Sequence, residues 1–468
     1  MRISKQTLSL LLFLFYTILV LSIESRPDAH YVLIPIFLAL WILIIFIFFL
    51  WKKDGGFPLL DAGFFCVIFV SMYTLIPLLN FYFGGFSFGE LSDRRLQYYA
   101  PSAMELGYFF SNHIIYLVSL ASSYVLCRRR NKWSPTLAIE DPSARTVNAV
   151  FIIFLVLTIY FAFFEYVLGL GFKSGYGDEE ISSGSLLVQQ INGKLAGIHY
   201  VFTYVALAIL ILNKRDIRAA SLVFVILTWG ILDAFIAFGS RGALMLLLLI
   251  SFTLWYRFHG VNVRFAFIFL PLFFLIFTFI GLVRPFANIQ DFGDSITSFE
   301  GFASSTNEFQ SLLGTSYDVK MLLENGVSVP IGLAFNDIMP LAPPQQIWPF
   351  TKLTGADWYL TQIGQAGTGV GFMWGVITQS LIGFGSLELA VRGVFLGWLL
   401  AKFHQCYQRH QTKLLPNVFY ILVCLSTIST FRDTTGAIFW DIFWIFLPSA
   451  AILWLFGSAK DLKSTYAK

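Results

Sequence analysis

Long apolar runs, separated by short polar segments, restrict this chain to one class of fold. A membrane-crossing helix needs about 20 mostly apolar residues, and twelve stretches of the sequence approach that length. In chain order they are Thr7–Ile23, Tyr31–Trp51, Leu59–Phe83, Gly107–Cys127, Val147–Leu170, Ala196–Asn213, Ala219–Phe238, Ala243–Tyr256, Phe265–Val283, Gly385–Lys402, Leu415–Phe431 and Ala437–Phe456. Only 12% of the residues are charged and 57% are apolar, whereas soluble domains average about 25% and about 45–50%. We therefore expect an all-α, polytopic integral membrane protein with about twelve transmembrane helices. The composition excludes an ordinary soluble globule, a disordered chain and a coiled coil.

The basic residues predict how these spans are oriented. If the N-terminus is cytoplasmic, 20 of the 31 lysines and arginines lie on the cytoplasmic side and 10 lie outside, as the positive-inside rule requires. Both termini are then cytoplasmic, and the net charge of +4 needs no nucleic-acid partner. The first span follows Arg2 and Lys5 and could pass for a signal peptide, but no clear cleavage site follows it. We therefore expect a retained anchor.

The spans divide the chain into three parts. Residues 1–283 form a bundle of nine spans, residues 284–384 form a large outer loop, and residues 385–468 form three more spans and a cytoplasmic tail. Val370–Phe403 is long enough for two spans, but two spans would move Lys402–Lys413 to the outside. We therefore expect Val370–Phe384 to be a re-entrant or interfacial helix, which is allowed only where protein or a polar cavity covers its backbone.

Three arginines at the outer ends of spans are candidate anion ligands: Arg241, Arg284 and Arg432. The planar guanidinium fork suits phosphate oxygens, and three forks at one membrane boundary would suit a lipid-linked diphosphate. The alternative is that each arginine reaches to the interface or pairs with a nearby acid such as Asp433.

Carboxylates in the spans and in the outer loop are the other candidates for chemistry. Ionisable groups within spans are costly, and this chain has four such acids: Glu165, Asp233, Glu388 and Asp441. Glu388 and Arg392 are four residues apart, so we expect them to pair. Five acids of the outer loop are candidate general bases for a sugar hydroxyl: Glu300, Glu308, Asp318, Asp337 and Asp357.

Aromatic and glycine residues of the loop offer further candidate contacts. Trp348 is one of five loop aromatics that could stack on sugar rings, the others being Tyr317, Phe350, Trp358 and Tyr359, although such residues also gather at membrane interfaces. Gly367 and Gly369 belong to a glycine turn whose amides could bind an anion. We expect His113 and His199 to be structural. The four cysteines lack CxxC spacing, and we expect no metal site and no disulfide framework.

Short motifs resemble one known family. Phe238–Met245, with the sequence FGSRGALM, resembles the small-Ser-Arg-Gly turn of Wzy-type O-antigen polymerases. Asn336–Pro340 and Ile347–Pro349 resemble segments of the family's large outer loop, and Gly383–Gly385 resembles its closing segment. The likeness extends over the whole topology but in motifs only over residues 238–385. Many relatives carry a glutamate where this chain has Gln379. A role for that acid is therefore not carried over; either Glu308 or Glu388 replaces it, or no acid is needed.

The resemblance implies a polymerase of the bacterial inner membrane whose site faces the periplasm. It would transfer a growing glycan from a polyprenyl diphosphate to a lipid-linked repeat unit, without a cofactor. Its partners would be the polyprenyl-diphosphate-linked oligosaccharide, membrane lipids and a chain-length regulator protein. The candidate site comprises Glu308 and Asp337 as catalytic residues, Arg241, Arg284 and Arg432 at the diphosphate, and Gly367, Gly369 and Trp348 at the glycan or an anion.

Two other functions fit parts of the pattern. O-antigen ligases resemble this layout but use a histidine in the outer loop, and none occurs between Arg284 and Gly369. A lipid-oligosaccharide flippase would suit twelve spans, but we expect it to have short outer loops and charges lining a central cavity. Here one loop is long and the charged candidates gather on one side, so polymerase is favoured over both, and also over a pure assembly scaffold.

Overall fold

The computed structural model describes ten ranges of the chain: residues 28–54, 60–84, 102–128, 139–140, 142–163, 186–212, 241–259, 307–337, 354–364 and 374–457. Within these ranges the regular structure is entirely helical, so the expected all-α class is confirmed for the described residues. Long apolar sequences leave helix as the natural solution because a helix satisfies all of its backbone hydrogen bonds internally.

Seven of the described helices are long and apolar enough to cross a membrane. They correspond to the predicted second to sixth, eleventh and twelfth spans. Their bounds are α2 (Ala29–Asp54), α3 (Ala62–Gly84), α5 (Ala103–Cys127), α6 (Ala144–Ala162), α7 (Leu186–Leu212), α17 (Leu414–Arg432) and the continuous run of α18 (Ala437–Asp441), the π-helix η4 (Ile442–Phe446) and α19 (Leu447–Gly457). The extension of the fifth span to Leu170 lies outside the described residues.

Two further predicted spans are helices with different bounds. The eighth is α9 (Arg241–His259), which begins within the predicted glycine–serine–arginine turn. The tenth is α16 (Gly385–Arg409), which continues seven residues beyond the expected end at Lys402. Helix α16 is not among the seven described helices that are long and apolar enough to cross a membrane. The first, seventh and ninth predicted spans lie outside the described residues, so the count of twelve stays a prediction.

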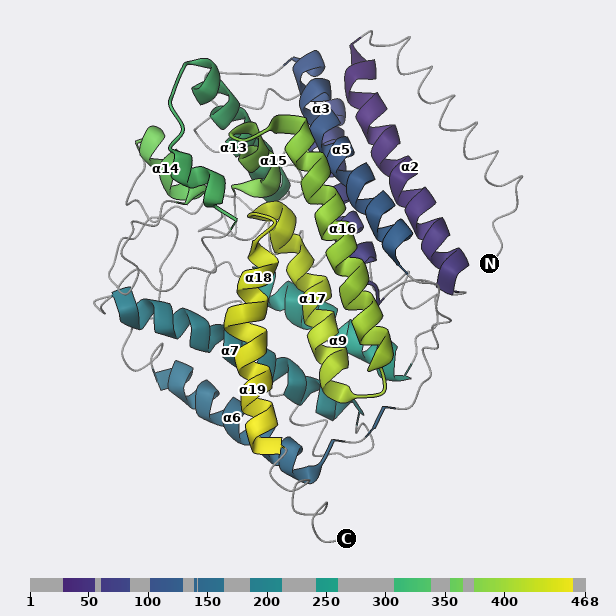
Figure 1. Ribbon diagram of the computed structural model, residues 1–468, viewed down its shortest axis with the longest axis vertical. Coiled ribbons are helices and arrows are strands. Elements are labelled where there is room, and N and C mark those ends of the chain that lie inside the picture. Colours follow the sequence, from purple (N-terminus) through teal and green to yellow (C-terminus); the bar gives the residue numbers. More distant parts are fainter. Residues whose placement is uncertain are drawn as a thin grey trace, which may run out of the picture.

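Helices α2, α3, α5, α16 and α17 lie side by side around one apolar core (Figure 1). Close contact between α16 and α5 depends on Gly393 and Gly397, where a side-chain carbon would come within 2.8 Å of the Tyr116 carbonyl oxygen or within 2.9 Å of the Tyr124 amide nitrogen. The hydroxyl of Ser123 donates to the Val394 carbonyl at 2.7 Å across the same contact. Helices α6, α7 and α9 fill the lower part of Figure 1, where α7 crosses α19 at a steep angle.

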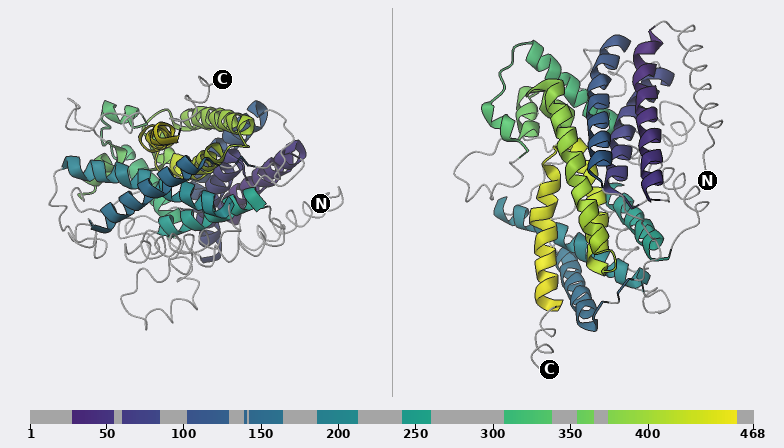
Figure 2. Two further views of the ribbon diagram at one scale, coloured as in Figure 1. Left: turned by 90° about the horizontal axis from the view of Figure 1, so that it is seen from below. Right: turned by 45° about the vertical axis from the view of Figure 1, so that its right-hand side comes forward.

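A second layer covers one end of this bundle and is called the cap layer here. It comprises α13 (Asn307–Glu324), the 3₁₀-helix η2 (Ile331–Phe335), α14 (Gly355–Gln362) and α15 (Gly375–Leu381) (Figures 1 and 2). The layer has a small apolar core of its own, made of Val319, Leu333, Trp358, Tyr359 and Trp374.

The segment expected to be re-entrant or interfacial is Val370–Phe384, and its described part, residues 374–384, contains the seven-residue helix α15. Most of α15 is buried, and it packs against α13, α16 and α17. Gly385 then adopts φ +60°, a left-handed conformation that suits glycine, and the chain reverses into α16.

Segments that the count of basic residues predicts to be cytoplasmic lie together at the opposite end of the bundle. Lys53, at the end of α2, donates to the Arg128 carbonyl at 3.0 Å. The Glu140 amide donates to the Thr412 carbonyl at 2.8 Å. Arg257, near the end of α9, donates to the Gln411 carbonyl at 2.8 Å. The described parts of the predicted outer loop therefore lie at one end, and these predicted inner segments meet at the other.

Candidate functional site

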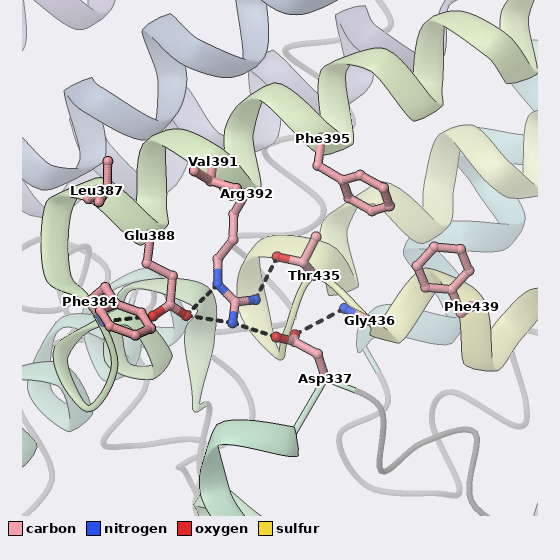
Figure 3. A pocket seen from close by; sticks show the side chains of 10 residues that line it. All are labelled: Asp337, Phe384, Leu387, Glu388, Val391, Arg392, Phe395, Thr435, Gly436 and Phe439. Atoms are coloured by element: carbon pink, nitrogen blue, oxygen red, sulfur yellow. Dashed lines mark hydrogen bonds and ion pairs between the residues drawn. The ribbon is translucent and has the colours of Figure 1, made fainter.

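A cavity of about 480 Å³ opens where the cap layer meets α16 and α18 (Figure 3). Its polar lining comes from three separate parts of the chain and comprises Asp337, Glu388, Arg392, Thr435 and Gly436. Its apolar walls are Phe384, Leu387, Val391, Phe395 and Phe439. Apolar walls with a few convergent polar groups, in a space of this size, are typical of small-molecule sites.

Arg392 is the centre of the polar lining. Its Nε and Nη2 donate to Glu388 Oε1 at 2.7 and 2.6 Å. Its Nη2 also pairs with Asp337 Oδ2, and its Nη1 donates to the Thr435 hydroxyl at 3.2 Å. All three nitrogen atoms of the guanidinium therefore donate to protein groups, and the predicted Glu388–Arg392 pair is confirmed.

Glu388 also fixes the start of α16. Its Oε2 accepts from the Phe384 backbone N–H at 2.9 Å (Figure 3). A helix leaves its first N–H groups without partners, so a carboxylate here satisfies one of them and complements the positive end of the helix dipole. Glu388 is thus held on both of its oxygens, and it in turn orients Arg392.

Asp337 reaches the cavity from the cap layer. Its Oδ1 accepts from the Gly436 backbone N–H at 3.2 Å, while Oδ2 faces Arg392. Of the three charged side chains it is the most open, 23% exposed against 13% for Arg392 and 15% for Glu388. An ionised carboxylate has about four lone-pair sites, so Asp337 retains room to accept a hydrogen bond from a ligand.

The backbone around Asp337 is positioned by its neighbour Asn336. The side-chain Nδ2 of Asn336 donates to Gln379 Oε1 at 3.0 Å, and its side-chain Oδ1 accepts from the Gly355 backbone N–H at 3.3 Å. Gln379 Oε1 also accepts from the Trp374 indole at 2.8 Å, and its Nε2 donates to the Leu333 carbonyl at 2.9 Å. Gln379 is 1% exposed, so it acts as a satisfied neutral amide within the cap layer and does not line the cavity.

The cavity carries a net negative charge. Two carboxylates face one guanidinium, and burial in low dielectric strengthens their attraction to it relative to water. The arrangement can accept hydrogen bonds from hydroxyl or ammonium groups, and it holds Asp337 where it could take a proton.

The other predicted site residues are distributed as follows. Arg432 is half-buried at the end of α17 and lies shortly before Thr435 and Gly436 in the chain. Arg241 begins α9 and Glu308 lies in the first turn of α13. The predicted ligands Arg284, Trp348, Gly367 and Gly369 lie outside the described residues. Asp337 is thus the predicted catalytic residue whose surroundings the structure describes.

Three of the aromatic side chains considered for sugar stacking, and the two histidines, are buried inside the protein. Tyr317, Trp358 and Tyr359 are at most 3% exposed, so they pack inside the protein instead of presenting faces to a sugar. His113 is buried against Thr74, with Nδ1 and the hydroxyl oxygen 3.2 Å apart, and His199 Nε2 lies 2.9 Å from the Thr158 hydroxyl. The burial of these three aromatic side chains matches neither sugar stacking nor a place at the membrane interface, whereas the contacts of His113 and His199 agree with their expected structural role.

Sequence reasoning missed the contact of Asp337 with Arg392 and Gly436. The sequence pattern indicated Arg432, four residues before Gly436, but gave no sign of the glycine's contact with Asp337. Sequence reasoning also missed a buried ion pair at the opposite end of the bundle, where Arg128 Nη2 lies 3.0 Å from Asp61 Oδ2. Arg128 donates to His404 Nε2 at 2.9 Å, which ties α16 to that pair.

Among the described residues, no three histidine, cysteine, aspartate or glutamate side chains form a metal-ligand group. A scan against protein-family models found no match, and neither did comparisons with curated proteins and with solved structures.

Proposed function

We propose that this protein is an O-antigen or surface-polysaccharide polymerase of the bacterial inner membrane. It is a glycosyltransferase with about twelve spans and cytoplasmic termini. Its donor is a growing glycan on polyprenyl diphosphate, its acceptor is a lipid-linked repeat unit, and its site faces the periplasm. A chain-length regulator and membrane lipids are its expected partners.

One observation carries this proposal. Asp337, from the segment predicted to be the large outer loop, meets Arg392 and Glu388 at the end of a bundle of apolar helices. The cavity between them has a wall of exposed apolar side chains on α16, such as Leu387 at 69% and Val391 at 61%. A site that joins charged groups to an exposed apolar wall suits a substrate with a polar head and a lipid tail.

The transfer requires one bond to form and one to break. The acceptor hydroxyl oxygen attacks the anomeric carbon of the donor glycan, and the bond between that carbon and the diphosphate oxygen breaks. The electron pair leaves with the polyprenyl diphosphate. Asp337 accepts the hydroxyl proton and later returns it to water. Arg241, Arg284 and Arg432 stabilise the charge that develops on the leaving diphosphate.

The test is a surface-polysaccharide ladder on a gel from a strain that lacks this gene. The strain is complemented with wild type, Asp337→Asn, Arg241→Ala, Arg284→Ala or Arg432→Ala at matched protein levels. Glu324→Gln is the control, because Glu324 is an exposed cap-layer acid whose partner is Lys320, at 3.6 Å. We expect a single repeat on the core in the empty strain and in the four site variants, and a full ladder with wild type and the control.

The outcomes separate the hypotheses. A null strain with no repeat on the core would favour a ligase or a flippase over a polymerase. If the null strain shows a single repeat but Asp337→Asn gives a normal ladder, the polymerase function is supported and Asp337 is not a catalytic residue.

A further inference from the structure

The cavity at Arg392 does not have the chemistry of a diphosphate site. Phosphate recognition by arginine uses the free guanidinium fork, often with two parallel N–H donors. Here Nε, Nη1 and Nη2 of Arg392 are each directed at Glu388, Asp337 or Thr435. A diphosphate would find no pair of parallel N–H donors without a protein partner, and it would face the negative charge of two carboxylates.

The same lining suits a hydroxylated ring. Asp337 and the hydroxyl of Thr435 can accept hydrogen bonds from ring hydroxyls at the polar end of the cavity. Phe395 and Phe439, whose ring centroids lie 6.4 Å apart, provide apolar faces beside that end (Figure 3). A sugar ring has both kinds of surface, with hydroxyls at its rim and C–H groups on its faces.

We propose that this cavity is the acceptor subsite, which holds the terminal sugar of the lipid-linked repeat unit with its reacting hydroxyl against Asp337. This inference rests on the polymerase function and adds which substrate group occupies the cavity. The net negative charge favours a neutral or amine-bearing sugar there and disfavours a uronic acid. The donor diphosphate is then bound by arginines outside this cavity.

Protection of an engineered cysteine tests the assignment. Leu387 lines the cavity and is 69% exposed, so Leu387→Cys places a thiol at its mouth. Cys127 and Cys406 are replaced by serine, while Cys66 and Cys424 are buried. Ile331→Cys is the control, because Ile331 is 84% exposed on the cap layer and does not line the cavity.

Two probes are compared on the purified full-length chain: the repeat-unit oligosaccharide freed of its lipid diphosphate, and inorganic pyrophosphate. At ten times its dissociation constant, the oligosaccharide should slow maleimide labelling at position 387 by about tenfold through simple occupancy. Pyrophosphate should leave that rate unchanged, and neither probe should change labelling at position 331. Val391→Cys, one helical turn further along α16, repeats the measurement if Leu387→Cys does not fold.

The results distinguish this inference from the function on which it rests. Protection by pyrophosphate and not by the oligosaccharide would make the cavity a leaving-group site and overturn the assignment. If neither probe protects position 387 while the wild-type gene restores the ladder, the polymerase function is still supported. The acceptor sugar then binds outside this cavity, and the assignment is wrong. A null strain that retains its full ladder would refute the polymerase itself, whatever the labelling shows.

Discussion

Gly436→Ala is the sharpest test of the site, because the glycine touches the backbone of Asp337 directly. A Cβ atom built on Gly436 would lie 2.8 Å from the Asp337 carbonyl carbon and 3.0 Å from its Cα, and closer still to its carbonyl oxygen. Carbon atoms prefer separations of about 3.5–4.0 Å, so the two segments must separate by roughly 1 Å. The φ of Gly436 is −74°, which alanine adopts freely. The effect is therefore purely steric.

This separation removes Asp337 from both of its partners at once. The separation lengthens the hydrogen bond from the Gly436 N–H to Asp337 Oδ1. It also moves Asp337 Oδ2 away from Arg392. A catalytic group misplaced by about 1 Å can lose roughly 100-fold in rate. We therefore expect Gly436→Ala to lower the polymerisation rate by about that factor, with a cost in folding free energy of about 1–3 kcal/mol from overpacking.

The assay is the rate of chain extension by purified protein on a lipid-linked repeat unit, together with the ladder in cells. Gly332→Ala is the matched control, since the new methyl group would meet nothing within 4 Å and the residue lies in the same cap layer. Chain extension by Gly436→Ala at the same rate as by Gly332→Ala would show that the position of Asp337 does not depend on its contact with Gly436.

Substitutions at three further positions probe the groups around the site and the opposite end of the bundle. Arg392→Ala should abolish the ladder because it leaves two carboxylates facing each other, whereas Arg392→Lys should retain part of it because it keeps the positive charge; equal ladders from both would mean that a positive charge at this position does not matter for polymerisation. Gln379→Glu should lower the free energy of unfolding by roughly 1–3 kcal/mol, because the buried side chain loses its N–H donor. Chemical denaturation of the solubilised protein measures this loss. An increase in polymerisation activity instead would show that an acid at this position is catalytic. Asp61→Asn should cost about 3–5 kcal/mol by leaving the charge of Arg128 buried without its partner, seen as a lower midpoint of thermal unfolding, and an unchanged midpoint would contradict the buried ion pair.

The helices could be predicted because a run of about 20 apolar residues admits few other structures. Their ends were harder to predict. Residues 403–409 of α16 continue as helix although they are polar, since His404 and Tyr407 are buried against other helices. Hydropathy does not register such contacts, because it scores each residue without its neighbours in space.

The site could be predicted only where partners share one helix. Glu388 and Arg392 are a local i, i+4 pair, and that spacing was sufficient. Asp337 was one of five loop acids that the sequence could not rank, because its partner Gly436 lies 99 positions further along the chain. The burial of Tyr359 likewise depends on the cap-layer core that surrounds it.

Helix α16 makes contacts with the proposed site near one end and structural contacts near the other. These two sets of contacts together depend on the length of the helix between them and on its rotation about its axis. Arg392 meets the cap layer, and His404 accepts from Arg128 at the other end. Each residue of a helix adds about 1.5 Å and about 100°. Inserting or deleting one residue between these two would therefore turn one contact away from its partner while the other held. The number of residues between Arg392 and His404 is therefore fixed by these two contacts, just as Gly393 and Gly397 between them are fixed by the close approach of α5.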